Sequence, residues 1–217
     1  MKNLLLSACL LVLGSAPASF AQPDEARAAA ARTLQDFAGR VSASNARSLG
    51  FQGPAEAGSG TLGEPLAVFM VSLEQLQRYQ GEDPGRLLLE LHRVVYPVQV
   101  EGEVRSLVEV QSTRGRWETV QIGGAQKSRL LEKHRRGVMR TAGARASDFF
   151  ELRVPALHLV FLAHHGAEGL VVTPLLDEAS LGLRAGQPEL ASRSSPGSPP
   201  GRARRPCSCL ERPLDEE

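Results

Sequence analysis

The chain has 217 residues, with 25 Lys and Arg against 24 Asp and Glu, and its formal net charge is +1. A charge this close to neutral gives no global reason to expect nucleic acid or an acidic membrane surface as a partner. The length suits one domain with a sizeable core, and three cysteines are too few for a disulfide framework.

Residues 1–21 have the pattern of a secretory signal peptide. Lys2 supplies the positive start, Leu4 to Leu13 form an apolar run, and Ser19-Phe20-Ala21 resembles a cleavage site. The run is shorter than the roughly 20 residues that span a bilayer. We therefore expect an exported protein, either secreted or periplasmic.

The same segment contains Leu6-Ser7-Ala8-Cys9, which matches a bacterial lipoprotein processing box and would place a lipid anchor on Cys9. Cys9 lies within the apolar run rather than after it, so ordinary cleavage is favoured. Cleavage removes Lys2 and leaves equal numbers of acidic and basic side chains.

The clearest helical pattern runs from Asp24 to about Val41. Asp24 and Glu25 suit the positive end of a helix, and alanine is abundant. One face is apolar and consists of Ala30, Leu34, Phe37 and Val41. This helix is expected to cover one face of a sheet.

A loop rich in glycine, alanine and proline is expected from Leu49 to Pro65. Gly58, Gly60 and Gly63 satisfy the dinucleotide-binding pattern G-x-G-x-x-G, but no strand precedes them and no helix follows. We therefore predict no nucleotide site and no cofactor.

A short strand is expected at 66–71, followed by a helix that Ser72 and Gln75 begin with a capping box. Another helical stretch is expected to start at Asp83-Pro84. It leads into three strands.

These strands, at 94–100, 104–112 and 116–122, form the predicted centre of the fold. Three-residue loops at 101–103 and 113–115 keep the apolar residues in phase. The phase gives one dry face, made of Val94, Tyr96, Val98, Val100, Val104, Val108, Val110, Val120 and Ile122. The opposite face is expected to be wet.

Two large apolar residues fall on that wet face, Leu107 and Trp117, with Arg105 near them. An exposed indole forfeits roughly 2–3 kcal/mol of hydrophobic burial, so something is expected to cover it. One option is a later segment of the chain, such as a helix at 127–140. The other is a partner, which makes Leu107, Trp117 and Arg105 the candidate binding residues.

Residues 127–140 carry six basic side chains against one acid, Glu132. The alternatives are an anion or nucleic-acid patch and the solvated face of a helix. No aromatic residues are interleaved to stack on bases, which favours the helix face.

The most hydrophobic stretch of the mature chain, 149–163, is apolar on both faces and predicts one central strand. Residues 170–175 are expected to return as its hairpin partner, and 177–183 as a helical turn or two. From 187 to 217 the composition changes to Ser, Pro, Gly and Arg, which predicts a disordered tail. The folded domain is therefore expected to span 22–186.

His158 and His164 are the candidate catalytic residues. On one strand they would lie about 20 Å apart, too far to share a metal ion, so no metal site is predicted. His158 is interpreted as a hydrogen-bonded core residue.

Together these patterns predict an α+β fold, with an antiparallel sheet covered on one face by the N-terminal helix and shorter helices. The function expected is that of an exported, non-catalytic binding or accessory protein of the bacterial envelope or exterior. Its partner is an unidentified protein or small ligand. The alternative is a hydrolase-like enzyme that uses a histidine near His158 or His164.

Overall fold

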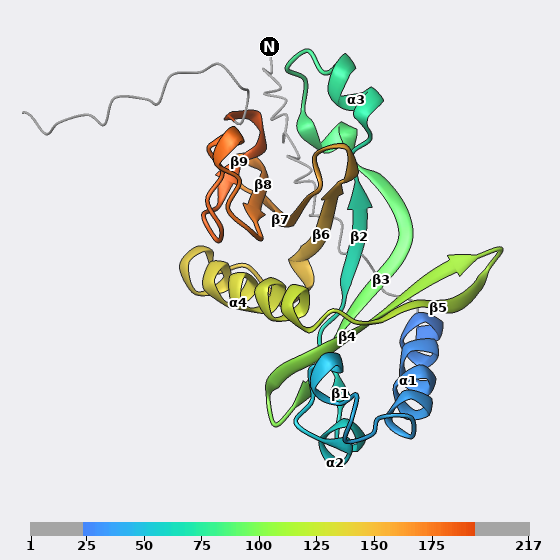
Figure 1. The fold of residues 1–217 in the computed structure, drawn as a ribbon. Coiled ribbons are helices and arrows are strands. Elements are labelled where there is room, and N and C mark those ends of the chain that lie inside the picture. Colours follow the sequence, from blue (N-terminus) through green and yellow to red (C-terminus); the bar gives the residue numbers. More distant parts are fainter. Residues whose placement is uncertain (1–23, 194–217) are drawn as a thin grey trace, which may run out of the picture.

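The computed structural model describes residues 24–193 and has an α+β fold, as the sequence predicts (Figure 1). The sheet strands are β1 (Thr61–Leu62), β2 (Leu66–Met70), β3 (Leu89–Val100), β4 (Glu103–Thr113), β5 (Arg116–Gly123), β6 (Phe149–Val154), β7 (Leu159–Gly166), β8 (Gly169–Pro174) and β9 (Glu189–Leu190). The α-helices are α1 (Asp24–Ala38), α2 (Pro54–Gly58), α3 (Leu73–Arg78) and α4 (Ala125–Ala142). Six 3-10 turns connect them, η1 (Arg47–Leu49), η2 (Pro84–Leu87), η3 (Ala146–Asp148), η4 (Pro155–Leu157), η5 (Ala179–Leu181) and η6 (Ala191–Arg193).

All nine described strands belong to one sheet, in the order β5-β4-β3-β2-β6-β7-β8-β9, with β1 paired to β3. Neighbouring strands are antiparallel, apart from β2 and β6, which run parallel. The parallel pair joins the β3–β4–β5 meander to the β6–β7–β8 meander, and the connection between β5 and β6 contains α4. The position of α4 therefore decides what covers the centre of the sheet.

Helix α1 covers the meander on the face that the sequence predicts to be dry. Ala26, Ala30 and Leu34 of α1 are buried in one cluster with Tyr96 and Val108 of the sheet. An alanine-rich stretch forms this helix readily, and the small side chains let it approach the strands closely. The predicted cover of this face is confirmed.

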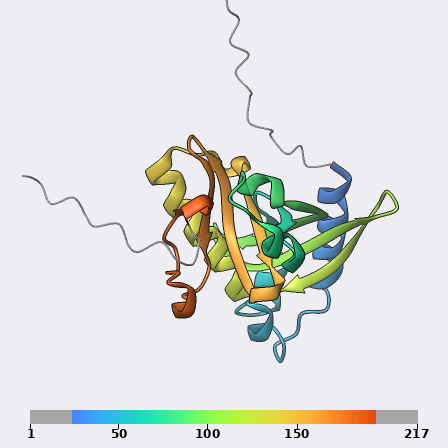
Figure 2. The same cartoon turned by 90° about the horizontal axis from the view of Figure 1, so that it is seen from above.

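The opposite face is also covered, so the predicted wet face is wrong. Helix α4 packs across it, and Leu131 and Val138 of α4 share a buried cluster with Val95 and Leu107 of the meander. Seen from above, α1 and α4 lie on opposite sides of the strands (Figure 2). Leu107, an apolar residue on the face expected to be polar, therefore belongs to a second core under α4.

The pairing of β3 with β4 confirms the predicted partners away from the turn: Val94 with Val110, Tyr96 with Val108 and Val98 with Ser106. Both hairpin turns, however, have two residues rather than three, at Glu101–Gly102 and Arg114–Gly115. All four of these turn residues have positive φ, as a type I′ turn requires.

A bulge in each hairpin reconciles the short turns with the buried faces. Arg105 is the extra residue in β4, and Val120 is the extra residue in β5. The second bulge reverses the side-chain alternation of β5 beyond it. Val120, predicted to be buried, is therefore 48% exposed. Trp117 consequently faces α1.

The predicted central strand at 149–163 is instead a hairpin. The 3-10 turn η4 at Pro155–Leu157 separates β6 from β7, and the two strands pair antiparallel. Proline has no N–H for the sheet ladder, which is consistent with a break at residue 155. Strand β6 takes the central position, between β2 and β7.

Strand β8 and the 3-10 turn η5 confirm the expectations for 170–175 and 177–183. The sheet extends past residue 186, where the folded domain was expected to end, because β9 pairs with β8 through Leu190–Val171 and Glu189–Val172. The predicted signal peptide at 1–21, its Cys9 and the predicted tail beyond residue 193 lie outside the described residues.

Candidate functional site

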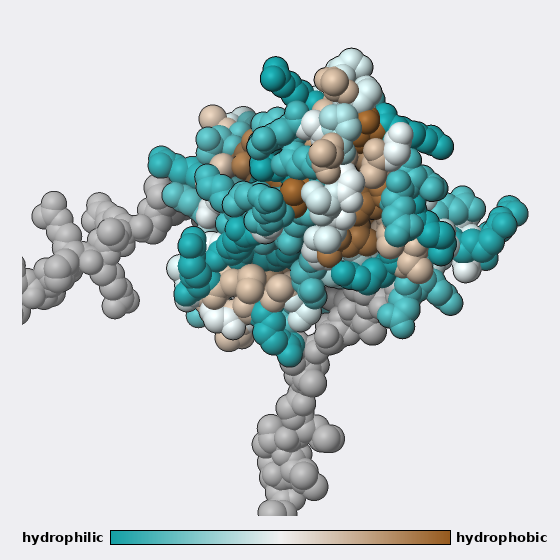
Figure 3. Space-filling model, turned by 90° about the horizontal axis from the view of Figure 1, so that it is seen from below, coloured by the Kyte–Doolittle hydropathy of each residue, from teal (hydrophilic) through white to brown (hydrophobic). Residues whose placement is uncertain are grey.

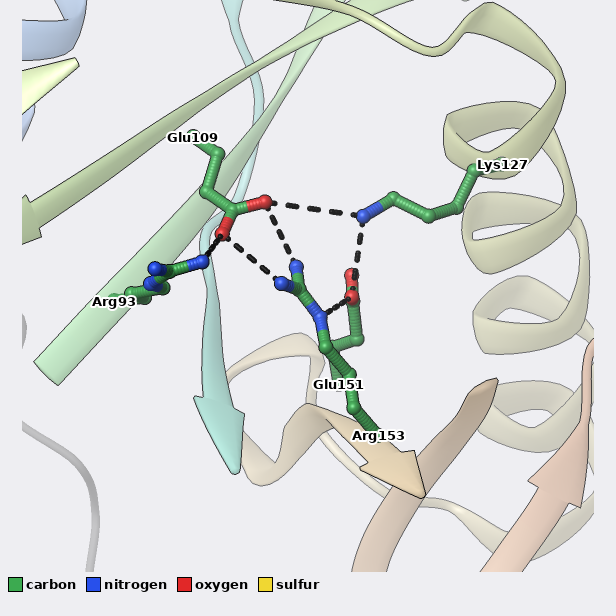
Figure 4. Close-up of polar contacts among 5 residues, drawn as sticks. All are labelled: Arg93, Glu109, Lys127, Glu151 and Arg153. Atoms are coloured by element: carbon green, nitrogen blue, oxygen red, sulfur yellow. Dashed lines mark hydrogen bonds and ion pairs between the residues drawn. The ribbon is translucent and has the colours of Figure 1, made fainter. Parts of the chain in front are cut away.

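A cluster of five charged side chains lies between α4 and the sheet (Figure 4). Its members are Arg93 of β3, Glu109 of β4, Lys127 of α4, and Glu151 and Arg153 of β6. The two carboxylates are almost fully buried, with 1% of Glu109 and none of Glu151 exposed. Carboxylates so deeply buried require partners, and the cluster supplies them.

Arg153 connects the two carboxylates. Its Nη1 and Nη2 donate to Oε1 and Oε2 of Glu109 at 3.1 and 2.7 Å, a bidentate pair. Its Nε donates to Oε1 of Glu151 at 2.6 Å. Residues 151 and 153 lie on the same face of β6, because side chains two apart on a strand point the same way.

Lys127 and Arg93 complete the cluster from either side. Nζ of Lys127 donates to Oε1 of Glu151 at 3.1 Å and lies 3.9 Å from Oε2 of Glu109. Nη1 of Arg93 donates to Oε1 of Glu109 at 3.2 Å. Within the described part of the chain, Oε2 of Glu151 is buried without a hydrogen-bond partner.

The cluster holds the carboxylate of Glu109 ionised and contains more basic than acidic side chains. Burial alone would raise the pKa of Glu109, but the hydrogen bonds and charge of Arg153, with the charges of Lys127 and Arg93, lower it below the usual value. Burial likewise opposes the charge of Arg153, and Glu109 and Glu151 outweigh it, so the pKa of Arg153 is raised. Three cations against two carboxylates leave one positive charge in excess.

A cleft of about 270 Å³ opens beside this cluster, between the first turn of α4 and the start of β7. Lys127 belongs to both the cluster and the cleft lining. Val160 in the cleft wall is the β7 partner of Arg153 in β6. The cleft wall is mainly apolar and consists of Leu130, Leu159, Val160, Leu175 and Leu176, with Gln126, Lys127 and His158 as its polar members. A small ligand with an apolar body and one polar group fits this lining.

The predicted binding face of Leu107, Trp117 and Arg105 does not exist as one surface. Leu107 is fully buried beneath α4. Trp117 packs, partly buried, against the cluster under α1 on the other side of the sheet. Nε of Arg105 donates to Oε1 of Glu56 at 2.7 Å. Leu107 keeps its predicted face, where α4 covers it, whereas the bulge at Val120 moves Trp117 to the face under α1. These side chains therefore form no common exposed face.

The two candidate histidines lie apart and in different surroundings. His158 ends η4 in the left-handed conformation, with φ of 54°, and is exposed at the cleft rather than buried in the core as predicted. His164 is 6% exposed near the far end of β7, with its ring 5.0 Å from that of Phe149. Burial lowers the pKa of His164, with a contribution from His165 and opposition from Asp148. Among residues 24–193, no three His, Cys, Asp or Glu side chains form a group that could hold a metal ion.

The basic residues of α4 are largely engaged in internal contacts. Arg135 and Arg136 both donate to the carboxylate of Glu132. Their remaining nitrogens reach the backbone oxygens of Glu64 and Gly102, at 3.1 Å each. These contacts attach α4 to the connections beside the strands. Residues 127–140 do belong to a helix, but Arg135 is buried rather than on the solvated face that was expected.

Two glycines of the G-x-G-x-x-G pattern, Gly60 and Gly63, permit close packing. A Cβ at Gly60 would lie 3.1 Å from Cγ1 of Val98, and one at Gly63 would lie 2.8 Å from Nε2 of Gln99. A second hollow of about 270 Å³ lies nearby, between α1 and the α2–β1 segment. Figure 3 views this end of the molecule and shows a band of hydrophobic side chains across a mostly hydrophilic surface. The one basic side chain that lines this hollow, Arg27, already donates to the backbone oxygen of Leu62 at 3.1 Å.

Comparison with family models, curated proteins and solved structures finds no match to this chain. No helix in the described range 24–193 is both long and apolar enough to cross a membrane.

Proposed function

We propose that this protein is a non-catalytic binding protein of the cell envelope or exterior, and that its ligand occupies the cleft beside Lys127. The single observation that carries the proposal is the joining of an apolar cleft to a buried, positively charged cluster through one side chain. Export is supported by the signal-peptide pattern at residues 1–21.

The dimensions of the cleft favour a small ligand over a protein partner. Ligand pockets commonly measure about 300–1,000 Å³, and this cleft, at about 270 Å³, is near the lower limit. Leu176 at its mouth is 60% exposed, so the apolar wall is open to solvent. A ligand that covered Leu176 would gain hydrophobic burial.

Substitutions at the mouth test this proposal. Leu176→Ser should weaken the binding of octanol or octanoate several-fold in isothermal titration calorimetry, because it removes apolar wall without touching the core. The matched control is Leu73→Ser on α3, where a leucine of similar exposure, 53%, lies outside the cleft. Equal affinities in both variants, or no binding by the unmodified protein, would contradict the proposal.

A hydrolase is the second candidate, because His158 lies at the same cleft. The lining has no serine, threonine or cysteine, so His158 would have to activate water rather than a side-chain nucleophile. The test is hydrolysis of p-nitrophenyl octanoate by the protein and by His158→Ala. His92→Ala is the control, because His92 is also exposed and also has positive φ, 50° against 54°. Activity lost only in His158→Ala would favour the hydrolase.

A further inference from the structure

We infer that the ligand of this cleft is a small amphipathic monoanion, with a carboxylate-like head at Lys127 and a short hydrocarbon tail along the apolar wall. This inference rests on the proposed function and specifies its ligand class. Four features carry it: the charge balance of the buried cluster, the hydrogen-bonding capacity of Lys127, the position of Lys127 in α4, and the apolar lining of the cleft.

The surplus positive charge of the cluster lies on the side chains that reach the surface. The carboxylates of Glu109 and Glu151 are at most 1% exposed, whereas Arg93, Lys127 and Arg153 are 31%, 23% and 20% exposed. Of these three cations, only Lys127 lines the cleft. An anion bound in the cleft would therefore meet the surplus positive charge of the cluster through this lysine.

The ammonium group of Lys127 also has N–H donors available for a ligand. An ammonium group has three donors, and one is used on Oε1 of Glu151 at 3.1 Å. Glu109 lies 3.9 Å away, which is an ion-pair separation beyond hydrogen-bonding distance. The remaining donors suit the two oxygens of a carboxylate head.

The start of α4 adds to the positive potential at the cleft. Its first turn contains no acidic residue, and its N-cap, Gly124, provides no side-chain cap. The positive end of the helix dipole therefore lies beside Gln126 and Lys127, which both line the cleft. The dipole and the ammonium repel one another, and an anion would relieve this repulsion. A cationic ligand would increase it.

The rest of the cleft specifies a short apolar tail. Beyond its three polar residues, the lining is leucine and valine. At about 270 Å³, the cleft lies just below the range of pockets that bury drug-sized ligands, so it suits a small, short-chain ligand. Octanoate has this size and charge, and 1-octanol is its neutral counterpart.

The test compares these two ligands by calorimetry in the unmodified protein and in three variants. A charge-assisted hydrogen bond contributes about 1.5–3 kcal/mol, so octanoate should bind at least about tenfold more tightly than 1-octanol. Lys127→Met should remove this preference, and Lys127→Arg should keep most of it. Lys133→Met should change nothing, because it makes the same charge change at an exposed position on the same helix.

The outcomes separate the inference from the proposed function. If octanol and octanoate bind equally to the unmodified protein, the inference is wrong while the binding function holds. A preference that survives in folded Lys127→Met also overturns it, because the anion is then held elsewhere. If neither ligand binds, the proposed function itself fails. Should Lys127→Met not fold, the ligand comparison in the unmodified protein and in Lys127→Arg decides.

Discussion

Glu151 shows at the scale of one residue why the charged cluster matters to the fold. Its carboxylate is fully buried at the centre of the sheet and accepts hydrogen bonds from Lys127 and Arg153 through a single oxygen. Without that negative charge, three partly buried cations would surround a single carboxylate. The cluster therefore depends on both acids.

Glu151→Gln should lower the free energy of unfolding by about 3–5 kcal/mol, the usual cost of breaking a buried ion pair from one side. Urea denaturation followed by circular dichroism measures it. The control is Glu74→Gln, which breaks an exposed pair with Arg78 and should cost less than about 0.5 kcal/mol. Similar losses in the two variants would mean that the cluster contributes no more than a surface pair.

His164 makes stability depend on pH. Burial lowers its pKa in the folded protein, and the same holds for His134, whereas a histidine in the unfolded chain titrates near 6.5. As the pH falls below about 6.5, the unfolded chain binds protons first, so stability is complete above that pH and decreases below it.

Replacing His164 with phenylalanine should flatten this decrease between pH 7 and pH 5, because an aromatic ring of similar shape remains against Phe149 without titrating. Denaturation midpoints at both pH values measure the slope. His92→Asn, at an exposed position of positive φ, serves as the control. An unchanged slope in His164→Phe would show that this residue does not set it.

The β4–β5 hairpin carries the clearest prediction at the scale of an element. With a two-residue turn and a bulge at Val120, the side chains of Ile122, Thr119 and Trp117 all face α1. The hydrogen bond between Oγ1 of Thr33 in α1 and Oγ1 of Thr119, at 2.6 Å, fits this register. A three-residue turn would instead bury Val120.

Alanine substitutions distinguish the two registers. Val120→Ala should change the free energy of unfolding by no more than about 0.5 kcal/mol, because Val120 is 48% exposed. Ile122→Ala should cost about 1–2 kcal/mol, since Ile122 packs, partly buried, against the cluster under α1. A large loss of unfolding free energy in Val120→Ala would contradict this register and support a three-residue turn instead.

Strand β9 gives a second test at this scale. A chain ending at Gly186 lacks β9 and the contact of Ala191 with the core beside β8, whereas a chain ending at Arg193 keeps both. The shorter chain should melt a few degrees lower, because each kcal/mol shifts the midpoint of a protein this size by about 2–4 °C. Equal melting temperatures would show that residues 187–193 contribute nothing to the fold.

At the scale of the whole molecule, sequence patterns predict the features that depend on residues close together in the chain, such as helix starts and hairpin pairs. The helix at Asp24, the capping box of Ser72 and Gln75, and the pairing of Tyr96 with Val108 are all observed. A bulge adds one residue at a position that alternation does not identify, so alternation alone places Trp117 on the wrong face.

The charged cluster could not be predicted, because its members come from four elements and meet only once the sheet is assembled. A signal was nevertheless present: Glu109 lies between valines, and Glu151 and Arg153 alternate with apolar residues. Charges in such strands normally face water, which is why strand pattern alone favours an exposed face. Here α4 covers that face and makes those charges internal.

A map of backbone amide shifts tests most directly whether the cleft beside Lys127 is the ligand site. Octanoate would be titrated into ¹⁵N-labelled protein, and the changes assigned along the chain. The largest changes should fall at 125–130, 158–160 and 175–176, the segments that form the cleft. Changes centred on the α1–α2 hollow at 57–62, or no saturable change at all, would contradict it.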